Sequence, residues 1–212
     1  MNRFDRAFGA AAGRVQSAAI KTLNDFARSN LPDEPNFTTA LVTRIHDNLA
    51  GFARGGVSWE ARILSPRHEE KRVGADFVGI LRLNLPGYSV AKAFLAQAKR
   101  QEPGFPLAPS HWSALVDQCK KMCERSPESY VLVYARNGVV VVPAVGVLAC
   151  SEHQDLHLLH PVGVKAFFKR HFECWVGQRL DAPESAAPWL SVDELPAKGI
   201  ELIGSANVED GA

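Results

Sequence analysis

Cysteine is scarce in this sequence, with four residues among 212. So few cysteines do not form the disulfide framework that holds together small secreted domains. Residues 1–21 mix acidic and basic side chains and contain no clean apolar block, so we expect no secretory signal peptide there. Together these features predict a reduced, cytoplasmic protein.

Long apolar runs are also missing. The most apolar stretch, VVVVPAVGVLA at 139–149, is interrupted by Pro143. It is shorter than the roughly 20 apolar residues that a membrane-spanning helix needs. We therefore expect neither a transmembrane segment nor a membrane partner.

The chain has no excess of charge of one sign, since 24 Lys and Arg stand against 23 Asp and Glu, a net charge of +1. A nucleic-acid role would need a local basic patch, because no global positive field is available. The sequence also lacks a G-x-S-x-G motif, a P-loop and a G-x-G-x-x-G motif. Serine hydrolase, nucleotide hydrolase and dinucleotide-dependent redox functions are therefore poor hypotheses.

The remaining composition is that of a globular protein, with 46% hydrophobic and 22% charged residues. This excludes a largely disordered chain, a collagen-like fibre and a coiled coil. The length suits one domain with an appendage at most. We divide the chain into an N-terminal helical extension (1–35), a core domain (36–180) and a partly ordered C-terminal tail (181–212).

Hydrophobic spacing predicts an interleaved series of helices and strands. Helices are expected over residues 4–30, 37–53, 111–124 and 162–176. Strands are expected over residues 57–65, 75–85, 129–135 and 139–149, with a short one at 199–203. Segment 91–100 stays open, because its alanines favour a helix while its alternating apolar positions suit a strand. This order is typical of an α/β fold in which helices cover one mixed sheet.

Three local signals refine these elements. Ser110 is a candidate N-cap for the helix that follows it. Asn137-Gly138 predicts a hairpin turn between two β-branched runs. Pro143 within the second run indicates an edge strand or a bulge.

The chemistry of the chain is expected where two of these segments meet. If 75–85 and 91–100 are both strands, Gln97 and Lys99 point to the same face. Asp76 lies at the start of the preceding strand, and neighbouring strands are about 4.8 Å apart. We therefore expect the three side chains to share a pocket. Gln118-Cys119-Lys120 repeats the Q-x-K pattern, but it falls in a predicted helix and is set aside.

These residue types suit the hydrolysis of a phosphodiester. A hard cation such as Mg²⁺ (or Mn²⁺) prefers oxygen ligands, which Asp76, the Gln97 amide and the Ala98 carbonyl would supply. Lys99 would lie beside the attacking water and offset charge on the phosphate. The metal would lower the pKa of that water and stabilise the transition state.

The same segments resemble the PD-(D/E)xK nuclease superfamily. Gly74-Ala75-Asp76 is similar to the first acidic motif of that family, and Gln97-Ala98-Lys99 to the second. The predicted helix, three strands, helix and strand over residues 36–149 match the family's core. The resemblance implies a restriction-endonuclease-like αβ sandwich and metal-dependent DNA cleavage, with a role in restriction or anti-phage defence.

Two departures from the family pattern bear on the metal site. Ala75 replaces the usual proline, and Gln97 replaces the usual acid, which removes one negative charge. Another carboxylate is needed to compensate for that charge. Glu70 is the first candidate because it closely precedes Gly74. The further candidates are Glu69 and Glu34.

A local group of cations is expected to bind the phosphate backbone. Its members are Arg72, Arg82, Lys92 and Arg100, with His111 lining the substrate cleft. Because the net charge is low, we expect affinity for DNA to come from a homodimer, a partner subunit or a regulated assembly.

Two other functions remain open, a catalytically inactive nucleic-acid or protein interaction domain on the same fold and an RNA-directed nuclease. A zinc site is a weaker hypothesis. Cys119 and Cys123 are four residues apart in a predicted helix, a spacing that suits buried free thiols better than zinc. His153, His157 and His160 are interpreted as surface or capping residues.

Overall fold

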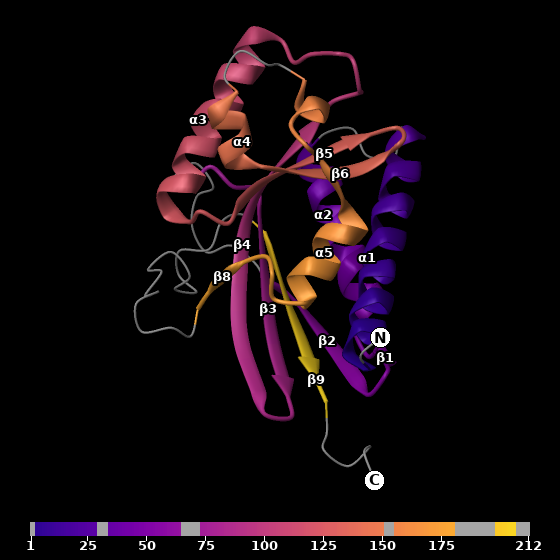
Figure 1. The fold of residues 1–212 in the computed structure, drawn as a ribbon. Helices are drawn as coiled ribbons and strands as arrows, with labels where there is room; N and C mark the ends of the chain where they lie inside the picture. The colour runs from indigo at the N-terminus through magenta and orange to yellow at the C-terminus, as the bar shows by residue number, and fades with distance from the viewer. Residues whose placement is uncertain (1–2, 29–33, 65–72, 151–154, 181–197, 207–212) are drawn as a thin grey trace.

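A computed structural model describes residues 3–28, 34–64, 73–150, 155–180 and 198–206. It confirms an α/β fold with a mixed central sheet flanked by helices (Figure 1). Glu69, Glu70, Arg72 and His153 lie outside the described residues. Within the described ranges, no helix combines the length and apolar character that crossing a membrane requires.

The helices are α1 (Arg3–Ala27), α2 (Glu34–Leu49), α3 (Pro109–Arg125), α4 (Ala144–Ala149), α5 (Val164–Phe172) and the short 3₁₀ helix η2 (Leu156–Leu158). The strands are β1 (Ala53–Arg54), β2 (Val57–Leu64), β3 (Phe77–Leu85), β4 (Tyr88–Arg100), β5 (Ser129–Ala135), β6 (Gly138–Pro143), β7 (Val162–Gly163), β8 (Gln178–Arg179) and β9 (Gly199–Ser205).

The strands are ordered β1-β2-β9-β3-β4-β5-β6-β7 in the sheet, and β8 pairs with β4. Strands β3 and β4 form an antiparallel hairpin, whereas β4 and β5 are parallel and are connected through α3. Strand β9 lies between β2 and β3, antiparallel to the first and parallel to the second. Residues 199–205 therefore contribute a strand to the interior of the sheet.

Strand β4 resolves the ambiguity over residues 91–100. Phe94, Ala96 and Ala98 belong to the core beneath α1, α2 and α5, and Leu95 belongs to the core beneath α3 and α4. A strand that is buried on both faces loses the strict alternation of polar and apolar residues. Its alanines therefore reflect close packing in the sheet and not helix propensity.

The prediction of a strand over 139–149 is wrong in its second half. Strand β6 ends at Pro143, and α4 begins at Ala144. Pro143 has φ −61° and serves as the N-cap of α4. A proline lacks a donor for the sheet and is compatible with the start of a helix, so it marks the change of element here. Strand β7 pairs with β6 at Val140 and Val141 and does not reach Pro143, which pairs with Tyr130 of β5 on its other side, so among the described strands Pro143 has the expected edge position.

Several predicted boundaries also shift. Helix α2 ends at Leu49 and not at 53, because Gly51 follows with φ 73°. Helix α3 begins at Pro109 with Ala108 as its N-cap, so the Ser110 cap is wrong. The β5–β6 turn is Arg136-Asn137, since Ala135 pairs with Gly138.

Helix α5 is also shorter than the predicted 162–176. Residues 162–163 pair with β6 as strand β7, and the helix ends at Phe172 before Cys174 at φ 64°. Helix α1 contributes to the same core as α2 and α5, and Phe37 of α2 stacks on Tyr134 of β5 at 4.0 Å. The division into an extension, a core domain and a tail stays a prediction.

Candidate active site

Asp76 is placed by the approach of the chain to β3. Its backbone N–H donates to the Ala96 carbonyl at 3.0 Å, which extends the β3–β4 ladder by one residue. Just before it, Gly74 has φ 77°, and a Cβ there would lie 2.6 Å from the Gln118 carbonyl oxygen of α3. Only glycine allows the chain to pass α3 this closely in this conformation. Asp76 therefore enters the sheet directly opposite the second half of β4.

The two motifs meet at the Asp76 carboxylate. Gln97 Nε2 donates a hydrogen bond to Asp76 Oδ2, and the backbone N–H of Ala98 donates to the same oxygen at 3.0 Å. Hydrogen bonds from amide donors stabilise the charged form of a carboxylate. The structure therefore brings Asp76 and Gln97 into direct contact, with Ala98 beside them.

Gln97 carries a buried oxygen without a partner. The residue is 2% exposed, and no described residue donates a hydrogen bond to its Oε1. A buried polar atom of this kind needs an explanation such as an ion or water. The Ala98 carbonyl oxygen lies 3.5 Å from Gln97 Nε2, so three oxygen-bearing groups gather at this point. This donor set fits a hard divalent cation.

Lys99 follows Gln97 by two residues in β4, so it lies on the same face of the sheet. That face is covered by α3. Burial raises the pKa of the Cys119 thiol to about 12, nearby Cys123 adds to the rise, and the positive charge of Lys99 opposes it. The half-buried Lys99 is therefore close enough to α3 to act on Cys119 electrostatically.

The carboxylate that would compensate for Gln97 is not identified among the described residues. Glu69 and Glu70 lie outside them, and Glu34 begins α2 with a side chain that also lies outside them. In the described part of the chain, no three His, Cys, Asp or Glu side chains gather as a metal-binding group. All three glutamates stay predictions.

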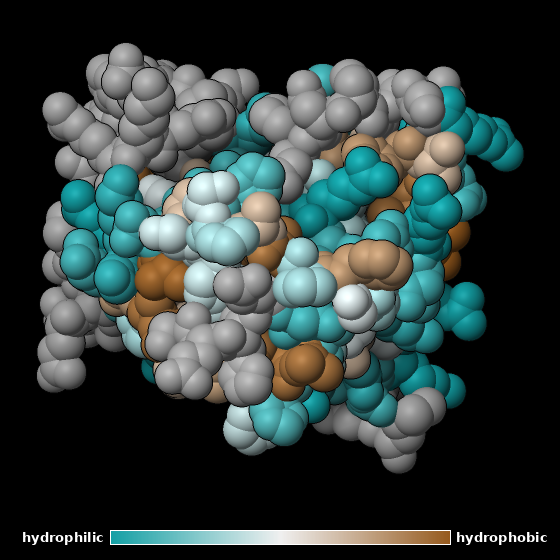
Figure 2. Space-filling model, turned by 90° about the horizontal axis from the view of Figure 1, so that it is seen from above, coloured by the Kyte–Doolittle hydropathy of each residue, from teal (hydrophilic) through white to brown (hydrophobic). Residues whose placement is uncertain are grey.

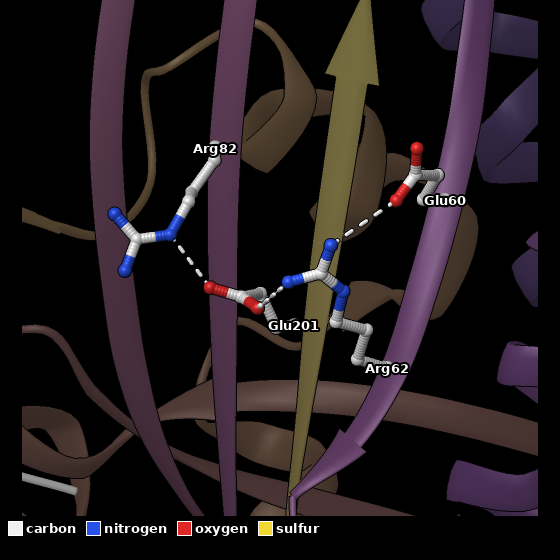
Figure 3. Close-up of polar contacts among 4 residues, drawn as sticks. All are labelled: Glu60, Arg62, Arg82 and Glu201. Atoms are coloured by element: carbon white, nitrogen blue, oxygen red, sulfur yellow. Dashed lines mark hydrogen bonds and ion pairs between the residues drawn. The ribbon is translucent and has the colours of Figure 1, made fainter.

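The cations expected at the substrate surface occupy separate places. Arg82 lies on an exposed sheet face, where its Nε donates to Glu201 Oε1 at 2.6 Å (Figure 3). Arg62 of β2 contacts both Glu60 at 3.3 Å and Glu201 at 3.8 Å. Two arginines and two glutamates thus balance one another across β2, β9 and β3, so Arg82 adds no net charge there.

Lys92 and Arg100 lie on the face of β4 opposite Lys99. Lys92 Nζ donates to the Cys174 carbonyl at 2.6 Å, and the Arg100 guanidinium lies 4.9 Å from the centre of the Phe26 ring. His111 is exposed in the first turn of α3, and Arg72 lies outside the described residues. The structure does not gather the described members of this group around Lys99.

Gln101 is a residue near the site that sequence reasoning missed. It is buried, and its Oε1 accepts a hydrogen bond from Leu156 N–H at 2.8 Å. His157 Nε2 donates to the Gln101 carbonyl at 2.9 Å, so η2 is attached to the end of β4. The polar series Gln97, Lys99 and Gln101 at alternate positions was the available signal.

No protein-family model matches this sequence, and searches of curated proteins and of solved structures find no match either.

Proposed function

We propose that this protein is a metal-dependent phosphodiesterase that hydrolyses DNA on a restriction-endonuclease-like αβ sandwich. One observation carries the proposal. The Asp76 carboxylate accepts hydrogen bonds from the side chain of Gln97 and from the backbone of Ala98, and Lys99 is the next residue. The two segments that resemble nuclease motifs are thus adjacent in space, although 20 residues separate Asp76 from Gln97 in the sequence.

Asp76, Gln97 and the Ala98 carbonyl would hold the Mg²⁺ or Mn²⁺ ion, with Glu70 adding the missing negative charge. A bound cation would supply Lewis-acid stabilisation of a phosphate oxygen and a lower pKa for a bound water. The Gln97 amide presents its nitrogen to Asp76, so its side chain must turn over to offer Oε1 as a ligand. The unpartnered Oε1 favours that exchange, because it would gain a partner.

Lys99 is the positive group of the site. Its ammonium would bind a non-bridging oxygen of the scissile phosphate and position the attacking water. Charge that develops on the phosphate is offset most strongly by a cation held in a half-buried position, where water screens it less. Lys99 would therefore contribute more to the rate than to substrate affinity.

The test is incubation of purified protein with closed circular plasmid and Mg²⁺ or Mn²⁺, with and without EDTA. We expect nicked or linear product only with metal, and a loss of at least about 100-fold in rate for Asp76→Asn and for Lys99→Ala. Lys120→Ala, at the exposed lysine of the Q-x-K in α3, is the matched control and keeps full activity. Full activity in Asp76→Asn or Lys99→Ala would overturn the proposal.

A catalytically inactive interaction domain is the second candidate. It is favoured by the hydrogen bond between Asp76 and the neutral Gln97, which satisfies the carboxylate without a metal. Binding of nucleic acid or protein without cleavage of DNA or RNA, under any metal, would support it. Preferential cleavage of RNA in a competition assay would support an RNA-directed nuclease. A role in restriction or anti-phage defence predicts fewer phage plaques on cells that express the wild type but not Lys99→Ala.

A further inference from the structure

Two large apolar side chains are exposed just beyond the end of β4. Phe105 is 71% exposed and Leu158 is 66% exposed. Their loops contact each other, because the Gly104 N–H donates to Asp155 Oδ2 at 3.0 Å. Figure 2 looks onto this end of the molecule and shows hydrophobic areas between hydrophilic ones. Single exposed apolar residues are ordinary, but two on adjoining loops beside a candidate site indicate a binding surface.

Phe105 is presented by an ordered turn. Its N–H donates to the Glu102 carbonyl at 3.1 Å, with Pro103 and Gly104 between them and Gly104 at φ 78°. These are the features of a type II turn, in which only glycine readily adopts that conformation. The Glu102 carboxylate accepts a hydrogen bond from the Arg136 N–H at 3.2 Å and so ties the turn to the β5–β6 hairpin.

Leu158 is held in a similar way. The adjoining Leu156 is fully buried, and its N–H donates to Gln101 Oε1 at 2.8 Å. Asp155 Oδ1 accepts a hydrogen bond from the His157 N–H at 2.9 Å and caps η2. The backbone at each exposed side chain is therefore held by hydrogen bonds. This lowers the conformational entropy that is lost when the side chain inserts into a partner.

The position of this pair points to nucleic acid as its partner. Gln101, which anchors η2, is two residues beyond Lys99 on the same face of β4. Of the acids that the structure describes on these two loops, Glu102 and Asp155 accept hydrogen bonds from backbone N–H groups, which stabilise their carboxylates. Arg136 is exposed in the adjacent hairpin turn. A polyanion that reached Lys99 would therefore meet Phe105 and Leu158 on the adjoining loops, beside the exposed Arg136.

We propose that Phe105 and Leu158 form an apolar wedge that enters a base step of duplex DNA while the backbone reaches Lys99. Apolar wedges partly unstack the base step and kink the duplex, and this bend brings more of the duplex into contact with the protein. The inference rests on the proposed function, because it takes the substrate to be DNA. The wedge distorts the duplex beside the phosphate that is cut and so selects flexible steps.

The test measures DNA unwinding, which needs no cleavage. Closed circular plasmid is relaxed by topoisomerase I with increasing amounts of the Lys99→Ala protein and Ca²⁺, and the linking number is read after the protein is removed. We expect the linking number to fall as protein is added. The fall disappears when Phe105→Ser and Leu158→Ser are added together. Trp175→Ser replaces an 80% exposed aromatic residue on the α5 side and should leave the fall in linking number unchanged. Circular dichroism and thermal denaturation establish that each variant folds.

Three results would overturn the wedge: no plasmid binding by the parent, binding without a change in linking number, or equal unwinding by the double variant. The last would indicate a surface for a protein partner. Wild-type cleavage with Mg²⁺ is measured in parallel on the same plasmid. Cleavage without unwinding would refute the wedge but not the proposed phosphodiesterase activity. Unwinding without cleavage would refute the phosphodiesterase activity but not the wedge.

Discussion

The neutral side chain of Gln97 sets the charge of the candidate metal site. Replacing it with glutamate places a second carboxylate against Asp76, where Gln97 now donates a hydrogen bond. Two adjacent carboxylates repel each other without metal and bind a divalent cation more tightly with it. For Gln97→Glu we expect about tenfold tighter Mg²⁺ or Mn²⁺ binding, which is about 1.4 kcal/mol. We also expect a lower melting temperature in EDTA.

Calorimetric metal titration and thermal denaturation with and without metal measure these two effects. Gln16→Glu, on α1 and away from the site, controls for added charge alone. If Gln97→Glu changed neither metal affinity nor the melting temperature in EDTA, the amide would not border a cation site.

A second prediction at the scale of one residue concerns His171 and the pH dependence of stability. It is fully buried, its Nδ1 donates to the Val176 carbonyl at 3.0 Å, and its ring packs on Phe94. Burial lowers the pKa of His171 to about 4, and the positive charge of Lys92 adds to this effect. Between pH 6.5 and about 4 the unfolded chain therefore binds a proton that the folded protein excludes.

The free energy of unfolding should consequently fall as the pH drops through that range, by up to about 1.4 kcal/mol per pH unit. His171→Asn keeps a donor for Val176 but does not titrate. Urea denaturation at pH 7, 6 and 5 compares the two proteins. The wild type should lose more stability than His171→Asn over this interval, and parallel losses would show that His171 is not responsible.

At the scale of elements, the local hydrophobic pattern predicted most strands and helices. It did not predict the positions at which a strand gives way to a helix. The β-branched run at 139–149 favoured a continuous strand, yet Pro143 ends β6 and α4 follows. For the candidate site, strand alternation was enough to place Gln97 and Lys99 on one face. It did not predict that Gln97 would be buried, because burial depends on packing between distant segments.

The β3–β4 hairpin gives a prediction at this scale. Gly79 lies opposite Phe94 in the register, and a Cβ on it would lie 2.4 Å from Phe94 Cε1. The Phe94 ring cannot move away from the added methyl group, because it packs against Phe77, Phe167 and Phe168. For Gly79→Ala we expect a loss of about 1–3 kcal/mol of unfolding free energy, measured by chemical denaturation.

Two further variants test that interpretation. Gly146→Ala, in α4, introduces a methyl group with no atom within 4 Å and should leave stability unchanged or raise it. Phe94→Leu in the Gly79→Ala background removes the clash and should recover part of the loss. A fully stable Gly79→Ala protein would show that the hairpin can separate at this pair.

At the scale of the molecule, the sheet is completed by the last described strand. The sequence predicted a short strand at 199–203, but nothing in its local pattern indicated that β9 would separate β2 from β3. Strand partners distant in sequence are chosen by the burial of a whole face, which becomes defined only when the other strands are in place. In β9, Leu202 pairs with Ala61 on one side and Leu81 on the other and is 1% exposed.

This arrangement predicts that the same substitution will cause a large loss of stability at Leu202 and a small change at the adjacent Ile203. Leu202→Asp places a carboxylate in the core beneath α1 and α2, and an unpaired buried charge costs several kcal/mol. Since domains are stable by only about 5–15 kcal/mol, we expect Leu202→Asp to lose cooperative unfolding, and Leu202→Ala to lose about 2–5 kcal/mol. Ile203→Asp faces the other side, between Arg82 and Glu60 in the register, where attraction and repulsion oppose each other, and should change stability by less than about 1 kcal/mol. Thermal and urea denaturation separate the two positions, and equal effects would mean that β9 does not join the sheet in this register.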